Sequence, residues 1–153
     1  MITLVKPVSI SLEKQDGRYS AMPHGGVYDL VYAAVSGTDT AARLRAVVAL
    51  GKSDDPRAVR PLADLLADAD PEIRLSATTA LGQLKSGRPV EDLIARLRDR
   101  NEQPAIREQA AVALAAIRST GSVRGLREFV AEGGEDPALC TYAENLLRNT
   151  CPM

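Results

Sequence analysis

The sequence predicts an all-α fold, a right-handed α-α superhelix of four helical hairpins that follows a strand-like N-terminal segment. Two observations lead to this prediction. Apolar residues recur at three- and four-residue spacing from residue 27 onward, as on one face of amphipathic helices. The stretch DPEIRLSATTALG at residues 70–82 also has three recognisable copies at nearly constant spacing. Such self-similarity indicates a solenoid in which each repeat stacks on its neighbours.

Residues 1–24 differ from the rest, because their apolar residues alternate with polar ones as in a strand. The alternating residues, interrupted only near Pro7, are Ile2, Leu4, Val8, Ile10 and Leu12. Asp16-Gly17 suits a tight hairpin turn, after which residues 19–22 return as a second strand. An isolated two-stranded hairpin is marginal in water. The segment is therefore either a hairpin that caps the stack or an arm that a partner orders.

Four helical hairpins fill the rest of the chain. Helices are expected over residues 27–36, 40–52, 57–67, 71–85, 89–100, 104–119, 123–132 and 137–149. Paired in order, they give repeats at about 27–52, 57–85, 89–119 and 123–149, in a repeat domain at 25–149 followed by a tail at 150–153. Equivalent leucines in the second helices are Leu50, Leu81, Leu114 and Leu147, at steps of 31, 33 and 33 residues. This regularity predicts four equivalent units.

The second helix of most hairpins carries its own start signal. Asp39, Asp70 and Asp136 stand where a carboxylate can accept bonds from the first unpaired backbone N–H groups of a helix. The residues that open three of these helices are Pro71, Pro104 and Pro137. Proline suits the first helical position, because its missing N–H would have no partner there. These prolines therefore begin helices.

The repeated stretch resembles a known family. Asp70-Pro71-Glu72-Ile73-Arg74, followed by Ala77 and Ala80-Leu81-Gly82, is similar to HEAT repeats, especially the short HEAT-like type named after phycobilisome lyases. The resemblance covers residues of about 27 to 149 and implies a ladder of acid–arginine bonds between neighbouring repeats. The ladder residues it implies here are Asp39, Arg43, Asp70, Arg74 and Arg107. Gln103 replaces the acid in repeat three and Cys140 replaces the arginine in repeat four, so the ladder is expected to end there.

Members of this family serve as assembly scaffolds and adaptors, or as parts of bilin lyases, of an iron-dependent hydroxylase and of DNA-repair enzymes. The His–Glu pairs expected of the hydroxylase are missing, because His24 is the only histidine. The aromatic residues and basic groove expected of the DNA-repair members are missing as well. The sequence shows no catalytic constellation, so no enzyme activity, metal or cofactor is expected.

Charge and cysteine content narrow the partners and the compartment. The net charge of −1 gives no global field that would draw the protein to nucleic acid or anionic lipid. Neither a signal peptide nor a membrane-spanning segment is recognisable. Cys140 and Cys151 lack metal-ligand spacing, and a disulfide between them would require the tail to fold back. A reduced, cytoplasmic protein is expected.

The second helices are expected to line the concave side of the stack. In the second helix of repeat two, Ile73, Ala77, Ala80, Leu81 and Leu84 form the buried stripe, which leaves Leu75, Thr79 and Gly82 on the opposite face. The partner-contacting residues predicted by extending this face to its neighbours are Leu44, Arg45, Val48, Leu75, Thr79, Glu108 and Val112. Contiguous exposed apolar surface usually marks an interface. The alternative is that adjacent helices or the N-terminal segment bury these residues.

These features predict a non-enzymatic scaffold or adaptor that binds another protein on its concave face. A lyase-like or cofactor-maturation subunit that presents a client protein or a cofactor is the alternative. A homo-oligomer could form through the N-terminal arm or the apolar strip. Neither nucleic acid nor membrane is expected as a partner.

Overall fold

The protein is seen here as a computed structural model, which describes residues 11–15, 18–22, 26–134 and 136–150. Strands β1 (Ser11–Gln15) and β2 (Arg18–Met22) form an antiparallel hairpin, with Ser11 opposite Met22 and Gln15 opposite Arg18. The pairing is of the predicted hairpin type, with the second strand where it was expected, while the predicted turn at Asp16-Gly17 lies outside the described residues. The alternating residues before position 11 and the division of the chain at residue 24 lie outside the described residues and stay predictions.

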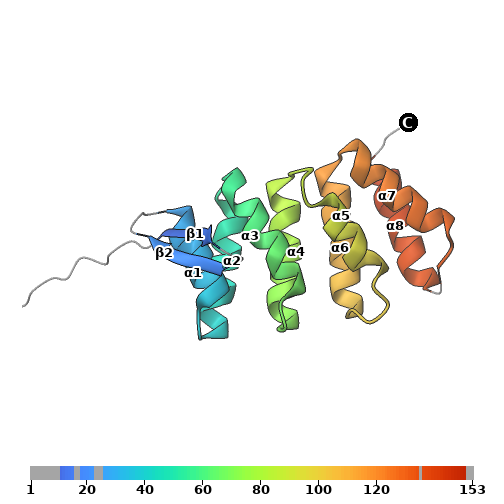
Figure 1. The fold of residues 1–153 in the computed structure, drawn as a ribbon. Coiled ribbons are helices and arrows are strands. Elements are labelled where there is room, and N and C mark those ends of the chain that lie inside the picture. The colour runs from blue at the N-terminus through green and yellow to red at the C-terminus, as the bar shows by residue number, and fades with distance from the viewer. Residues whose placement is uncertain (1–10, 16–17, 23–25, 135, 151–153) are drawn as a thin grey trace, which may run out of the picture.

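Eight helices follow within the described residues, and they form the four expected hairpins (Figure 1). The first helices are α1 (Val27–Ser36), α3 (Val59–Asp64), α5 (Val90–Arg98) and α7 (Thr120–Ala131). The second helices are α2 (Thr40–Lys52), α4 (Pro71–Leu84), α6 (Pro104–Ile117) and α8 (Pro137–Thr150). Short 3-10 turns at Pro56–Ala58 and Leu65–Ala67 extend α3 at both ends. The all-α solenoid predicted from the sequence is therefore confirmed.

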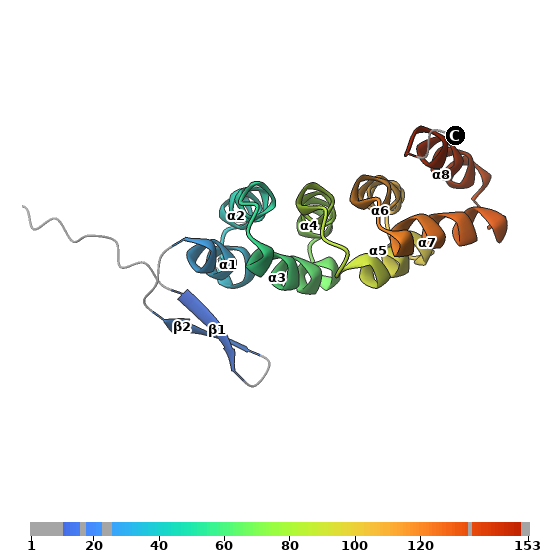
Figure 2. The ribbon, with the colours of Figure 1, turned by 90° about the horizontal axis from the view of Figure 1, so that it is seen from above.

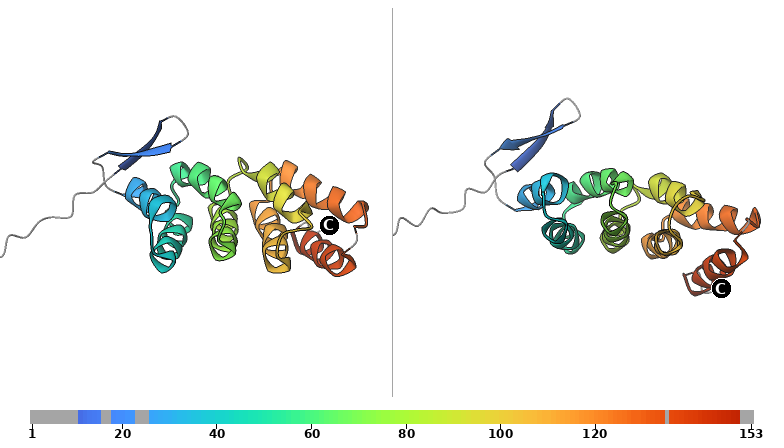
Figure 3. Two further views of the ribbon diagram at one scale, coloured as in Figure 1. Left: turned by 60° about the horizontal axis from the view of Figure 1, so that its bottom comes forward. Right: turned by 90° about the horizontal axis from the view of Figure 1, so that it is seen from below.

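The helices form two layers, with the first helices in one and the second helices in the other (Figure 2). The row curves so that the second-helix layer lies on the inside, most visibly where α8 turns over. The hairpin contacts α1 through β1 and lies on the first-helix side of the stack (Figure 3). We call the exposed side of the second-helix layer the inner face.

Capping explains where the second helices begin. The side chains of Asp39, Asp70 and Asp136 accept hydrogen bonds from the N–H groups of Ala42, Glu72 and Leu139 at 3.0, 2.9 and 3.1 Å, as predicted. Helix α7 begins three residues before the expected Val123. Its start is set by Ser119, whose hydroxyl accepts a bond from the Ser122 N–H at 3.1 Å.

The core runs between the two layers. Leu50, Leu81 and Leu114 are fully buried there, whereas the equivalent Leu147 of the last hairpin is only partly buried. Within the described residues, no further repeat covers the outer side of α8. In the part of the chain that the structure describes, the last hairpin therefore packs against a neighbouring repeat on one side alone.

Second helices approach one another closely at glycines. A Cβ at Gly51 would lie 2.8 Å from the Ala80 Cα, and one at Gly82 would lie 2.9 Å from the Ala113 Cα. Gly51, Gly82 and the equivalent Ala115 are buried. The prediction that these positions belong to the exposed concave face is therefore wrong, because the neighbouring second helix covers them.

Candidate functional site

An open groove of about 430 Å³ lies on the inner face between α2 and α4. The residues that line it are Leu44, Val48, Glu72, Leu75, Ser76, Thr79, Ala80 and Gln83. Four of the predicted contact residues, Leu44, Val48, Leu75 and Thr79, are thus brought together in one hollow. We call this the inner groove.

Exposure differs along the inner groove. Val48 is 42% exposed, and Leu44 and Leu75 are partly buried. The described hairpin lies on the opposite side of the stack and does not cover the groove (Figure 3). Neighbouring helices bury the glycines but leave the branched aliphatic side chains in contact with solvent. Burial by adjacent helices, one of the two alternatives from the sequence, therefore holds for the glycines, while partner contact at the aliphatic residues stays a prediction.

The remaining predicted contact residues lie outside the groove lining. Arg45 is exposed on α2, while Glu108 is exposed and Val112 partly buried on α6. Glu72 and Ser76, which line the groove, were not among the predicted contacts. A periodicity could have revealed them, since residues 72, 76, 79 and 83 recur at steps of four, three and four along one side of α4.

The polar groups of the groove are concentrated at its rim. Inside the groove, the Thr79 hydroxyl donates to the Leu75 carbonyl oxygen at 3.0 Å, so its hydrogen is already engaged within α4. Lys52 lies in the last turn of α2 and Glu72 in the first turn of α4. Both are exposed, and neither forms an ion pair with another residue in the described part of the chain.

The arginine ladder lies at the edge where the second helices begin, and its acidic partners differ from the prediction. Arg43 pairs with Asp68 and donates from Nε to the Ala34 carbonyl oxygen at 2.8 Å. Arg74 forms a two-pronged pair with Glu102, with both N–O distances 2.8 Å.

The third rung of the ladder joins Arg107 to Asp136 at 3.4 Å. Asp39 and Asp70 were expected to be the ladder acids, but they cap their own helices instead. Gln103 does not interrupt the ladder, because the neighbouring Glu102 provides the carboxylate for Arg74, and Arg107 reaches the following repeat. Cys140 stands at the equivalent position of α8, so the arginine series does stop there.

The first two rungs favour the ionised form of their carboxylates. Hydrogen bonds from Arg74 lower the pKa of Glu102 and outweigh the effect of burial, and the same pair raises the pKa of Arg74. Burial alone would raise the pKa of Asp68, but hydrogen bonds from Arg43 and from the Asp70 N–H lower it below its usual value. Glu102 has a side chain only 2% exposed. The ladder is therefore a partly buried ionic seam between repeats.

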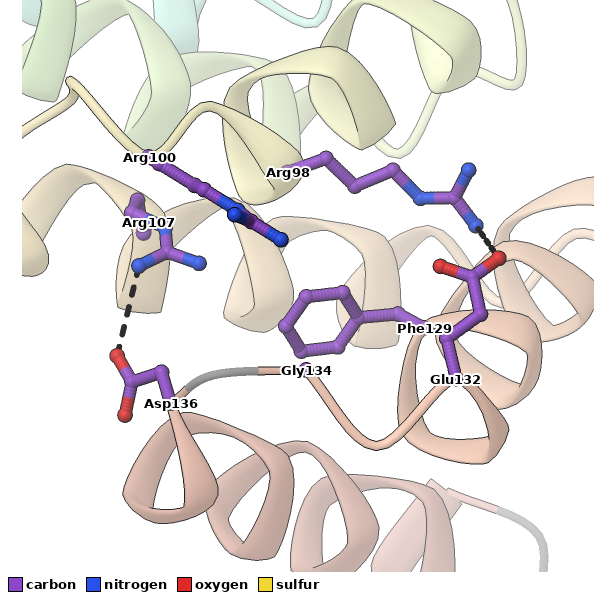
Figure 4. A pocket seen from close by; sticks show the side chains of 7 residues that line it. All are labelled: Arg98, Arg100, Arg107, Phe129, Glu132, Gly134 and Asp136. Carbon is purple, nitrogen blue, oxygen red and sulfur yellow. Dashed lines mark hydrogen bonds and ion pairs between the residues drawn. The ribbon is translucent and has the colours of Figure 1, made fainter.

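A second hollow, of about 370 Å³, lies beside the third rung (Figure 4). Its wall carries two ion pairs, Arg98–Glu132 at 2.9 Å and Arg107–Asp136 at 3.4 Å. Phe129 is nearly buried beneath them, and Arg100 points into the same hollow (Figure 4). Since its acids bond to its arginines, this hollow belongs to the contact between repeats three and four.

Groups with metal-binding or nucleophilic chemistry are sparse. In the part of the chain that the structure describes, no cluster of three or more His, Cys, Asp or Glu residues is placed to hold a metal ion. Cys140 is a partly buried free thiol, whereas His24 and Cys151 lie outside the described residues. None of the described helices combines the length and the apolar character needed to cross a bilayer.

Comparisons with known proteins agree with this architecture. The sequence profile of HEAT repeats matches residues 27–103 and 65–139. A similar solved structure is that of human deoxyhypusine hydroxylase in complex with glycerol, at 25% sequence identity and a TM-score of 0.70. The match covers 84% of this chain and 45% of the hydroxylase chain, so this chain spans less than half of that protein's length. No curated protein matches the sequence significantly.

Proposed function

This chain belongs to the HEAT-repeat family, and we propose that it is a non-enzymatic scaffold or adaptor that binds a partner protein through the inner groove. The observation that carries the proposal is the open apolar hollow between α2 and α4, with Val48 42% exposed. Aliphatic side chains that remain in contact with water on a folded protein favour association, because their burial is favourable.

The surroundings of the groove support a protein partner. Arg45, Lys52, Glu72 and Gln83 form a polar rim around the aliphatic residues, as in protein interfaces with an apolar centre and a solvated edge. The rim carries both signs of charge, which favours neither nucleic acid nor an anionic membrane surface. The inner face of a curved row of helices also gives a partner a continuous surface across several repeats.

A lyase-like or cofactor-maturation subunit is the second candidate, and the similarity to a hydroxylase structure supports it. In this role the chain would present a client or a cofactor to another protein. A metal-binding hydroxylase in its own right is disfavoured by the supply of ligands, because the sequence holds a single histidine and such a site would need His–Glu pairs. Co-purification of coloured or metal-bearing material with the chain would favour the subunit role.

A pull-down from native lysate, read by mass spectrometry, tests the scaffold proposal. Val48→Asp places a charge in the groove and should remove the specific partner. Tyr32→Asp is the matched control, because Tyr32 is 39% exposed on α1, in the other layer. Retention of the same partners by Val48→Asp, or their equal loss in both variants, would contradict binding at the inner groove.

A further inference from the structure

We propose that the inner groove accepts one amphipathic α-helix of a partner, antiparallel to α2 and α4, with an acidic residue near its N-terminus and a basic residue about three turns later. The inference rests on the proposed function and specifies the occupant of the same groove. It is carried by the polar groups inside the groove, the direction of its walls and the charges at its two ends.

The interior of the groove favours a helical occupant over an extended one. An extended peptide leaves backbone N–H and C=O groups that its binding site must satisfy. Leu44, Val48, Leu75 and Ala80 offer no side-chain hydrogen bonds, and the hydroxyl hydrogen of Thr79 is engaged with the Leu75 carbonyl oxygen. The Ser76 hydroxyl is the other polar group between these residues, and one hydroxyl cannot satisfy the backbone of an extended peptide. A helix satisfies its backbone internally and presents only side chains, which suits a groove between two helices.

The walls of the groove run in the same direction. Gly51, near the end of α2, lies against Ala80 and Gln83, which are near the end of α4. Glu72 therefore lines one end of the groove, and Lys52, which follows Gly51 but does not line the groove, lies on the rim beyond the other end. The axial distance between residues 72 and 83 of α4 is about 16 Å at 1.5 Å per residue.

The charges at the ends set the orientation of the occupant. An acid opposite Lys52 and a base opposite Glu72 would be complementary, and neither Lys52 nor Glu72 has another ion-pair partner in the described part of the chain. Arg45, the third charged residue of the rim, lies seven positions before Lys52 on α2 and so on the side of Glu72, which leaves the Lys52 end as the more positive end of the rim. A helix is itself stabilised by an acid in its first turn and a base in its last. Both preferences are met when the N-terminus of the occupant lies at the Lys52 end, antiparallel to α2 and α4.

The spacing of the occupant follows from the same geometry. Residues i and i+11 lie on one side of a helix, about 16 Å apart, and i+4 and i+7 lie between them. The matching pattern is an acid at i, aliphatic residues at i+4 and i+7, and a base at i+11. In the antiparallel orientation these four positions lie level with Gln83, Thr79, Ser76 and Glu72 of α4, in that order.

Two synthetic 16-residue peptides test the proposal with the full chain. Both carry leucines at i+4 and i+7; the first has Glu at i and Lys at i+11, and the second has these two exchanged. By fluorescence anisotropy, the first should bind about 3- to 10-fold more tightly, since each exposed ion pair contributes little. The preference should shrink in about 0.5 M salt, where exposed charges are screened.

Charge exchange in the protein separates orientation from peptide helicity. Lys52→Glu with Glu72→Lys should reverse the preference, and Lys52→Gln with Glu72→Gln should abolish it. An unchanged preference in these variants, equal binding of both peptides, or binding of neither would overturn the inference. If both peptides bind equally and Val48→Asp removes both, the proposed function survives. Peptide binding that Val48→Asp leaves intact would count against the groove itself.

Discussion

The arginine ladder and the inner groove lie on the same second helices. Their side chains differ in how many partners they have within the protein. At the edge, Arg74 uses its guanidinium on Glu102 and on the carbonyl oxygens of Asp68 and Ala69. In the groove, Val48 remains 42% exposed and Lys52 has no ion-pair partner in the described part of the chain. The hydrogen-bonded side chains of the ladder hold neighbouring repeats together. The exposed apolar and charged side chains of the groove and its rim remain available to another molecule.

The contrast between the two regions also shows that the charged residues of the repeated stretch are not the ones left exposed for binding. The closely spaced acids and arginines of the repeated stretch resemble a charged site, yet the structure engages them in caps and rungs. The less conspicuous Leu75 and Thr79 border the open groove. Substitutions in the two regions should therefore separate stability from binding.

Among substitutions in the ladder and the inner groove, the largest effect on stability is expected from Glu102→Ala. Removing the carboxylate leaves the partly buried guanidinium of Arg74, 18% exposed, without its directly bonded carboxylate, and it also removes the pair of Glu102 with Arg96 at 3.4 Å. We expect the free energy of unfolding to fall by about 3 kcal/mol, measured by urea denaturation followed by circular dichroism. Glu132→Ala, which removes an exposed pair with Arg98, is the control and should cost less than about 1 kcal/mol. Equal losses in the two variants would mean that the Arg74–Glu102 pair contributes no more to the free energy of unfolding than an exposed pair does.

Acid should weaken the seam before it affects the apolar packing. The pKa values of Asp68 and Glu102 are lower in the folded protein than in the unfolded chain. Their contribution is therefore complete above the unfolded-state pKa values of about 4 and is lost as the pH falls through the folded values. Urea denaturation at a series of pH values should show a smaller loss of stability below about pH 4 for Glu102→Gln than for wild type. Parallel curves would contradict this assignment.

The smallest effect on stability is expected in the groove. Val48→Asp should change the free energy of unfolding by no more than about 0.5 kcal/mol, because the side chain is already partly in water. Leu81→Ala, at a fully buried position of α4, should cost about 2–5 kcal/mol and provides the scale. Thermal and urea denaturation measure both variants. A loss in Val48→Asp that approaches the loss in Leu81→Ala would identify the groove as core.

The helices and their order could be predicted from the sequence because their signals are local. The cap at Asp39 and Pro71 at a helix start depend on residues within one turn, and the recurrence of Leu50 as Leu81 shows that the same local pattern repeats after 31 residues. The sequence Asp16-Gly17, which is typical of a tight turn, likewise suggested a hairpin as one of two alternatives for this segment. The apolar strip was also found in this way, since a helical period assigns Leu44 and Leu75 to one side.

Tertiary structure alone decided the partners of the arginines and the edges of the groove. Asp68 and Glu102 lie in turns before their helices, and only the path of each turn brings them to Arg43 and Arg74. Gly82 is buried because α6 lies close to it. The spacing of apolar residues within α4 contains no information about this contact. Periodicity gives the direction of a side chain from its own helix axis, whereas burial and pairing depend on the distance and offset of the neighbouring helix.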